Sequence, residues 1–169
     1  GTDTADYSAA VGSVNVDLSS GQASNDGDGG VDTLIGIEDV LGSANNDVIA
    51  GDSGANTLTG NGGNDYLYGA GGIDALDGGA GTEDYADYLN AANGVTVDLS
   101  IGQATDDGDG ASDTLANIEN IRGSSNDDAI SGDGNANRLL GGDGDDTLFG
   151  DAGNDTLEGG AGDDTLDGG

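Results

Sequence analysis

Aspartate side chains recur every nine residues along much of this 169-residue chain, each after a short glycine-rich segment. In Gly141–Phe149, glycine stands at the first, second and fourth positions, Asp146 at the sixth and Leu148 at the eighth. Glycine-rich segments can take positive φ angles and turn several carbonyl oxygens toward one point, and the carboxylate adds negative charge. These hard oxygen ligands suit Ca²⁺ better than softer metals, because the chain has no cysteine or histidine. The spacing therefore predicts a series of calcium-binding turns.

The candidate ligands are the side chains at the sixth position of each repeat and several residues of the turns themselves. The sixth-position candidates are Asp32, Asp47, Asn56, Asp65, Asp74, Glu83, Asp113, Asp128, Asn137, Asp146, Asp155 and Asp164. The turn candidates are Gly60, Gly63, Gly72, Gly141, Asp143, Gly144, Gly150, Gly153, Gly159 and Gly162. Asn56 and Asn137 are neutral and are expected to weaken their sites, and Glu83 is longer than aspartate.

The three residues after each turn are expected to form a short strand. Because successive side chains of a strand alternate between its two faces, the eighth position would point to the opposite face from the seventh and ninth. The eighth position holds Ile49, Leu58, Leu67, Leu76, Tyr85, Ile130, Leu139, Leu148, Leu157 and Leu166. Stacked strands of this kind make a thin, two-sided solenoid with a single file of core residues per side, which is weak unless metal lies between the turns. We therefore expect an all-β fold with Ca²⁺ as part of its structure.

The composition argues against several classes of partner. The chain has 36 glycines and 33% hydrophobic residues, and 34 acidic residues against two arginines give it a net charge of -32. Such a chain repels itself, nucleic acid phosphates and anionic membrane surfaces. No apolar run approaches the roughly 20 residues that cross a bilayer. We therefore expect calcium ions as partners, with no nucleic acid and no membrane insertion.

A longer repeat divides the chain into two modules, in which Tyr7 corresponds to Tyr88 and Val14–Leu18 to Val95–Leu99. The first module, 1–81, has irregular strands in 1–41 and a nonapeptide array in 42–81; the second, 82–169, has irregular strands in 82–122 and an array in 123–169. Both ends of the chain fall inside a nonapeptide repeat, so we expect it to belong to a longer protein.

The irregular part of each module is expected to contain strands as well. Apolar and polar residues alternate in 14–18 and 95–99, which predicts half-buried strands. Segments 36–41 and 117–122 carry aliphatic residues just before the arrays and are each interpreted as one shortened rung.

Two other interpretations conflict with this spacing. A disordered acidic tail has no reason to keep an aliphatic residue two positions after most of the aspartates. An EF-hand is suggested by Asp26-Gly27-Asp28 and Asp107-Gly108-Asp109, but the twelfth loop position, which requires glutamate, holds Ile37 and Ile118. The phased repeat therefore favours calcium-binding turns over both.

The residues of Gly141–Asp167, and less strictly those of 42–81, resemble the RTX family of haemolysin-type calcium-binding repeats in secreted bacterial proteins. The resemblance implies a right-handed parallel β-roll, a β-helix solenoid in which two nonapeptides make one turn and Ca²⁺ lies between repeats n and n+2. Asp47 and Asp65 would then share one side, and Asn56 and Asp74 the other. In the second module, the resemblance places Asp128, Asp146 and Asp164 in one row and Asn137 and Asp155 in the opposite row. Several Ca²⁺ ions, about six to ten, would bind with six to eight oxygens each.

The function expected from these features is a non-catalytic calcium-binding repeat region of a larger extracellular protein. The resemblance also implies type I secretion of an unfolded chain that folds on binding Ca²⁺ outside the cell, in the medium or on the bacterial surface. One alternative is a repeat segment of a self-assembling surface layer, filament or adhesin, whose partners would be further copies of the protein or a cell-surface polymer.

Another alternative is an accessory domain of a secreted hydrolase or epimerase. For this chain itself we expect no enzyme activity. It lacks histidine, cysteine and lysine, and each carboxylate recurs in register instead of marking a unique site. The activity of the parent protein stays open.

Overall fold

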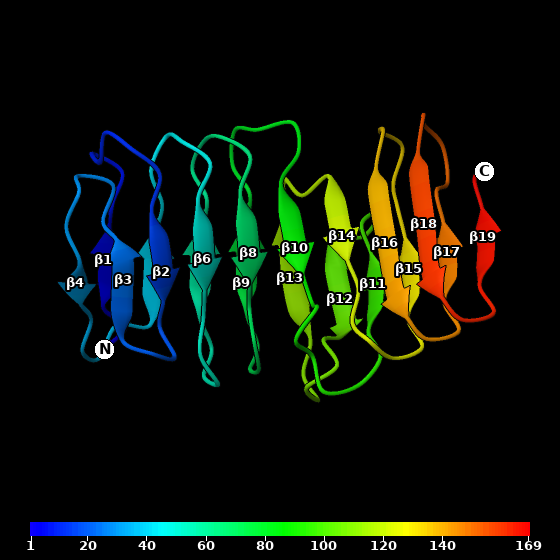
Figure 1. The fold of residues 1–169 in the computed structure, drawn as a ribbon, viewed down its shortest axis with the longest axis horizontal. Coiled ribbons are helices and arrows are strands. Elements are labelled where there is room, and N and C mark those ends of the chain that lie inside the picture. Colours follow the sequence, from blue (N-terminus) through cyan, green and yellow to red (C-terminus); the bar gives the residue numbers. More distant parts are fainter.

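The computed structural model describes residues 1–169 and consists of short β-strands and their connections, without any helix (Figure 1). The strands are β1 (Thr4–Asp6), β2 (Asn15–Asp17), β3 (Gln22–Asn25), β4 (Asp32–Thr33), β5 (Asp39–Leu41), β6 (Val48–Ala50), β7 (Thr57–Thr59), β8 (Tyr66–Tyr68), β9 (Ala75–Asp77), β10 (Tyr85–Asp87), β11 (Thr96–Asp98), β12 (Gln103–Asp106), β13 (Asp113–Ala116), β14 (Asn120–Arg122), β15 (Ala129–Ser131), β16 (Arg138–Asp143), β17 (Thr147–Phe149), β18 (Thr156–Ala161) and β19 (Thr165–Asp167). A membrane-spanning helix is accordingly not found.

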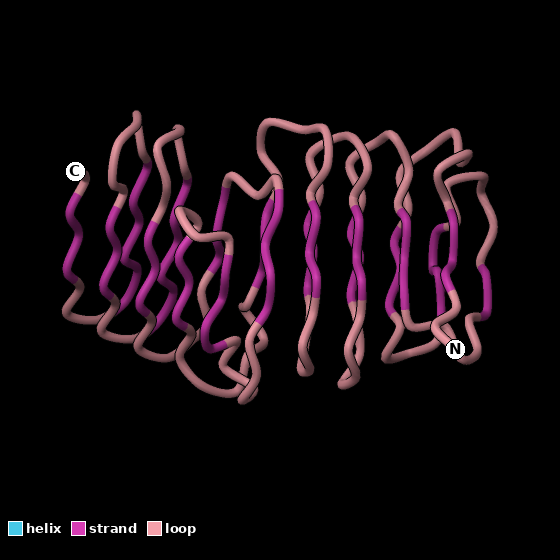
Figure 2. Tube along the Cα trace, turned by 180° about the vertical axis from the view of Figure 1, so that it is seen from behind, coloured by secondary structure: helices cyan, strands magenta, loops and turns pink.

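The strands form two sheets that run along the length of the molecule. Sheet A has the order β1-β5-β7-β9-β13-β12-β11-β15-β17-β19, and sheet B has the order β18-β16-β14-β10-β8-β6-β2-β3-β4. Successive strands of the nonapeptide arrays alternate between the sheets, so that β6 pairs in parallel with β8, and β7 with β9. Figure 2 shows the resulting flattened coil, with strands in the middle and turns at both edges. The predicted all-β solenoid of parallel strands is confirmed.

Two antiparallel excursions interrupt this pattern and were not expected from the sequence. The strands β2, β3 and β4 pair antiparallel at one end of sheet B, and β11, β12 and β13 do the same in the middle of sheet A. The chain reverses after β2 because Gly21 takes a φ of 66° and its N–H donates to the Leu18 carbonyl at 3.1 Å. The 36–41 and 117–122 segments, interpreted above as shortened rungs, contain the parallel strands β5 and β14.

The core is the predicted single file of aliphatic side chains between the sheets. Seven eighth-position residues are at most 1% exposed: Ile49, Leu58, Leu67, Leu76, Ile130, Leu139 and Leu148. At the last repeat Leu166 is 47% exposed. The prediction for Tyr85 is wrong, because Ala86 belongs to the core cluster there and pairs with Leu67. Tyr85 is only 9% exposed but lies outside that cluster and pairs with Tyr66. The Tyr66 and Tyr85 rings are stacked with their centroids 4.6 Å apart.

Strands that correspond to each other in the longer sequence repeat lie in opposite sheets. For example, β6 belongs to sheet B and its counterpart β15 to sheet A. In the same way, β8 lies in sheet B and its counterpart β17 in sheet A. Between two such counterparts the chain crosses from one sheet to the other an odd number of times, so the second counterpart ends in the opposite sheet. Both sheets continue from the first copy of the longer repeat into the second, because β10 pairs with β8 and β13 with β9.

Candidate metal centre

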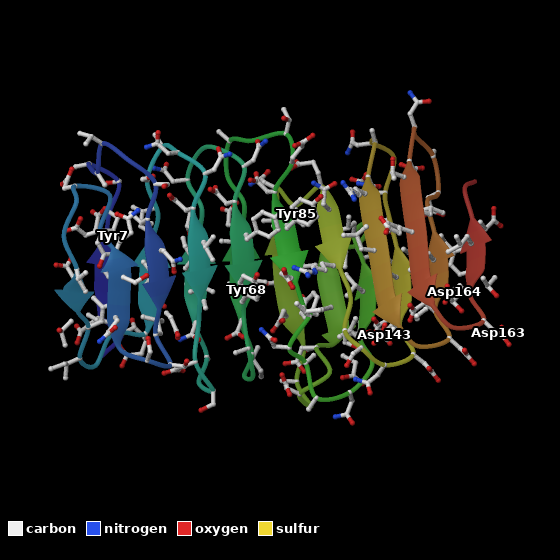
Figure 3. All side chains as sticks on the ribbon, viewed as in Figure 1. Tyr7, Tyr68, Tyr85, Asp143, Asp163 and Asp164 are labelled. Atoms are coloured by element: carbon white, nitrogen blue, oxygen red, sulfur yellow. The ribbon has the colours of Figure 1, made fainter.

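Except at β1, β2 and β11, the residue that precedes each parallel strand of the stack, or begins it in the case of Asp113, belongs to one of two rows, one at each edge of the solenoid (Figure 2). The row before sheet B contains Asp47, Asp65, Asp84, Glu119, Asn137 and Asp155, and the row before sheet A contains Glu38, Asn56, Asp74, Asp113, Asp128, Asp146 and Asp164. Consecutive members of a row belong to neighbouring strands of one sheet, except where β11 and β12 separate Asp113 from Asp128. Figure 3 shows Asp164 beside the last strand. Each row is thus a line of carboxylates and amides spaced by the strand separation, about 4.8 Å.

Within a row, one oxygen of each carboxylate binds the backbone of the preceding turn. Asp65 Oδ1 accepts a hydrogen bond from the Asp47 N–H at 2.7 Å, and Asp84 Oδ1 accepts one from the Asp65 N–H at 2.7 Å. In the other row, Asp113 Oδ1 accepts from the Asp74 N–H at 3.0 Å. The same bond joins Asn56 to Asp74, Asp128 to Asp146, Asn137 to Asp155 and Asp146 to Asp164. Each carboxylate therefore spans two successive turns.

The second oxygen of many of these carboxylates is buried without a hydrogen-bond partner. This is the case for Oδ2 of Asp65, Asp74, Asp84, Asp146 and Asp155. A buried polar atom without a partner costs about 1–3 kcal/mol, and a charged one more. These atoms consequently fit a cation that binds them from the turn.

The glycines of the turns make room for these oxygens in two ways. A side chain at the first position, for example at Gly60 or Gly141, would collide with the carboxylate of the same turn. At the fourth position the requirement is both conformational and steric, since Gly63 and Gly144 have φ angles of 111° and 120° and a Cβ atom there would collide with the backbone of the neighbouring turn. The positive φ angles expected from the sequence are therefore present at the fourth position, whereas the first position needs glycine for space alone.

Three buried carboxylates of the rows also resist ionisation without a cation. Burial, partly offset by the bond from the Asp47 N–H and reinforced by the charges of Asp47 and Asp84, raises the pKa of Asp65 to about 7. Burial likewise raises the pKa of Asp74 to about 7 and that of Asp113 to about 6. These sites therefore require either a proton or a cation.

In some members of the rows, the polar side-chain atoms already have hydrogen-bond partners within the protein. Both oxygens of Asp47 accept hydrogen bonds from Ser43, through its N–H at 2.6 Å and its hydroxyl at 2.8 Å. Asn56 Nδ2 donates to the Glu38 carbonyl at 2.8 Å, while its Oδ1 accepts from the Asp52 N–H. The second array has the same arrangements at Asp128 with Ser124 and at Asn137 with the Glu119 carbonyl. At the asparagines, an amide N–H therefore binds a backbone carbonyl of the neighbouring turn.

Three sequence-predicted residues lie elsewhere. Glu83 is exposed, and Asp84 occupies the predicted place in the row because the turn before β10 is one residue longer than the others. Asp32 is exposed on β4 and accepts a hydrogen bond from the Tyr7 hydroxyl at 3.3 Å. Asp143 is also exposed (Figure 3).

Sequence reasoning missed Asp84, although the longer repeat contains a signal for it. Asp84-Tyr85-Ala86-Asp87-Tyr88 corresponds to Asp3-Thr4-Ala5-Asp6-Tyr7, so that Asp84 matches Asp3. It also missed Glu119, whose Oε2 accepts from the Asp84 N–H at 3.0 Å and extends the row.

No group of three or more acidic side chains forms a metal cage by itself. A cation at these turns would therefore take one or two carboxylate oxygens together with backbone carbonyls of the glycine-rich segments. Ca²⁺ accepts such mixed oxygen sets in flexible geometry.

Comparison with known proteins gives one family. The model of the RTX calcium-binding nonapeptide repeat matches residues 41–76, 113–148 and 140–169 in four copies, which together cover more than half of the chain. No curated protein matches the chain.

We predict that the calcium-free fold becomes less stable as the pH rises from about 4 to 7. The pKa values of Asp65 and Asp74, 3.8 ordinarily, are raised to about 7 in the fold, so the folded state takes up protons more readily than the unfolded chain. This stabilisation is complete below pH 3.8 and is lost as the pH rises through 7. Thermal unfolding in calcium-free buffer, followed by circular dichroism, measures it.

The double variant Asp65→Asn/Asp74→Asn provides the control, because its melting temperature should depend less on pH over this range. A melting temperature of the calcium-free wild type that rises from pH 4 to 7 would contradict the prediction.

Proposed function

Because the chain belongs to the RTX calcium-binding nonapeptide repeat family, we propose that it is a non-catalytic structural region that folds when Ca²⁺ binds its turns. The observation that carries this proposal is the set of buried Oδ2 atoms without partners at Asp65, Asp74, Asp84, Asp146 and Asp155. These carboxylates and the carbonyls of their turns would hold the ions. The bound cation supplies the positive charge and the oxygen coordination that the two rows lack.

The charge distribution supports the same role. The net charge is -32, and the two arginines are engaged outside the rows: Arg122 with Asp87 at 3.3 Å and Arg138 with Glu158 at 3.5 Å. No cationic side chain thus neutralises the carboxylates between the turns. Binding of cations to the folded state alone would stabilise it by mass action.

We further propose that the parent protein is secreted by a bacterium, with this region unfolded before export and folded outside. The family match and the acidic, metal-dependent core support this proposal. Extracellular calcium modules bind with Kd values on the order of 10⁻⁴–10⁻³ M.

A calcium titration followed by circular dichroism tests both proposals. In chelator at neutral pH the spectrum should be that of a largely unfolded chain, and calcium should produce a β-rich spectrum with a midpoint on the order of 10⁻⁴–10⁻³ M. Magnesium at the same concentrations serves as the control. A β-rich spectrum that chelation leaves unchanged would refute calcium-dependent folding, and a submicromolar midpoint would refute an unfolded state before export.

The side chain of Asp65 offers a sharper test. Asp65→Asn keeps the acceptor for the Asp47 N–H and removes a buried charge, so the variant should be more stable than the wild type without calcium. In saturating calcium it should be less stable, by about 1–3 kcal/mol, because a ligand is lost.

The matched control for this substitution is Asp163→Asn, since Asp163 is exposed beside the row (Figure 3). Denaturant unfolding of the three proteins in saturating calcium, together with the folded fraction of each in chelator measured by circular dichroism, gives the comparison. Equal calcium stabilisation of Asp65→Asn and wild type would show that Asp65 is not a ligand.

A second candidate function is a spacer in an assembled surface layer, filament or adhesin. Its specific support is the continuity of both sheets between the two copies of the longer repeat, through the β8–β10 and β9–β13 pairs. Sedimentation in millimolar calcium distinguishes self-assembly from a solitary role. Assembly predicts a mass that grows with protein concentration, and a species with the mass of one chain throughout would contradict it.

A further inference from the structure

Two tyrosine rings stack on the outer face of sheet B, where the second copy of the longer repeat joins the first. Tyr66 on β8 pairs with Tyr85 on β10 in a parallel register. The ring centroids lie 4.6 Å apart, and the ring planes are inclined to each other by 5°. Both rings point away from the core, since the next residues, Leu67 and Ala86, are 0% exposed within it. The two strands therefore hold the rings as a close pair.

The nine-residue repeat does not require this pair. In the other copy of the longer repeat, the counterpart of Tyr66 is Thr147 and that of Tyr85 is Thr4. Thr147 pairs with Thr165 in the same parallel register, so β17 and β19 join without aromatic rings. The stack is thus a local property of the β8–β10 junction.

Tyrosine is the most readily oxidised side chain that this protein offers. The chain has five tyrosines and no cysteine, methionine, tryptophan or histidine. Tyr66 is 36% exposed and open to an oxidant in solution, whereas Tyr85 is 9% exposed. Because the rings are stacked, a radical formed on Tyr66 can pass to Tyr85. Both rings can therefore be oxidised from the exposed side.

The other three tyrosines have different neighbours. Tyr68 pairs with an alanine on β6. Tyr7 and Tyr88 lie outside the strands, and their hydroxyls donate hydrogen bonds to Asp32 and Asp113 at 3.3 and 3.4 Å. The stacked pair on β8 and β10 therefore differs from them in having a second phenol as its neighbour.

The arrangement of the stacked rings suits the coupling of two phenoxyl radicals. Burial raises the pKa of Tyr85, and the charge of Tyr66 raises it further against the opposing effect of Arg138, so the two hydroxyls lie near each other. With the rings parallel and the hydroxyls at the same end, the Cε carbons beside each hydroxyl face those of the other ring. In a phenoxyl radical these carbons share the unpaired electron in orbitals perpendicular to the ring. Stacking thus directs the reactive orbitals at each other.

We propose that Tyr66 and Tyr85 form a site of oxidative cross-linking, at which a haem peroxidase with hydrogen peroxide joins the two rings as a dityrosine. Each ring loses one electron and its hydroxyl proton, and the peroxide takes up both electrons and both protons to become two water molecules. A bond then forms between one Cε carbon of each ring. The hydrogen on each of these carbons is released as a proton while a proton returns to each oxygen, which restores both phenols. The product lacks two hydrogen atoms.

The cross-link would tie the two copies of the longer repeat together by a covalent bond. It joins β8 of the first copy to β10 of the second and closes a loop that contains β9. The inference goes beyond the proposed calcium function, because it requires the folded stack and not a particular ion in the turns. A cross-link that forms equally well in chelator would count against calcium-dependent folding and would leave the cross-linking site in place.

The test is treatment of the full chain in saturating calcium with a haem peroxidase and hydrogen peroxide. Digestion with an aspartate-specific protease and mass spectrometry of the monomer then locate the bond. The peptides of Tyr66 and Tyr85 should be joined, with the loss of two hydrogen atoms, and the product should show dityrosine fluorescence.

Phenylalanine variants provide matched controls, because phenylalanine keeps the ring and removes only the hydroxyl. Tyr66→Phe and Tyr85→Phe should each lose the cross-linked peptide, whereas Tyr68→Phe, two residues along the same strand, should keep it. Absence of the joined peptide from the wild-type monomer would overturn the inference. Dityrosine that persists in the Tyr66→Phe monomer, or that forms only between chains, would overturn it as well.

Discussion

The repulsion between like charges at neighbouring turns is the constraint on which the rest of this structure depends. Successive strands place ionisable carboxylates about 4.8 Å apart along each row. At an effective dielectric constant of about 20, one such pair costs on the order of 3–4 kcal/mol. The core, one side chain thick between the two sheets, offers little to offset such a cost over many turns. The packing of Ile49, Leu67 and Leu148 and the neutralisation of the rows are therefore parts of one folding problem.

The turns solve this problem in more than one way. Asn56 and Asn137 replace a charge with an amide whose N–H binds a carbonyl, and Ser43 and Ser124 satisfy both oxygens of the carboxylates in their turns. Other turns, such as that of Asp65, leave an oxygen without a partner. The solenoid is thus a mixture of turns that close by themselves and turns that need an added positive charge. The turns whose polar groups all have protein partners begin each array, next to the irregular strands.

Much of this architecture could be predicted from the sequence because two positions of the nine-residue repeat are decisive. The eighth position supplies the core side chain, and the sixth supplies the side chain in the row. Leu58 and Leu76 lie where their spacing indicates, and so do Asp47 and Asp74. The prediction failed where a local event breaks the period. One additional residue moved Asp84 and Ala86 into the places expected for Glu83 and Tyr85, and a turn at Gly21 reversed the chain.

The exchange of sheets between counterpart strands has a consequence for the outer surface. Counterparts such as β8 and β17 face opposite sides of the molecule, so each copy of the longer repeat is turned by about half a revolution relative to the other. The relation approximates a two-fold screw axis along the solenoid. In any extended array of such copies, the pattern on one side would recur only in every second copy, at twice the period of the sequence. A rigid partner lying along one side would therefore contact alternate copies, and adjacent copies would be free to diverge on their outward faces.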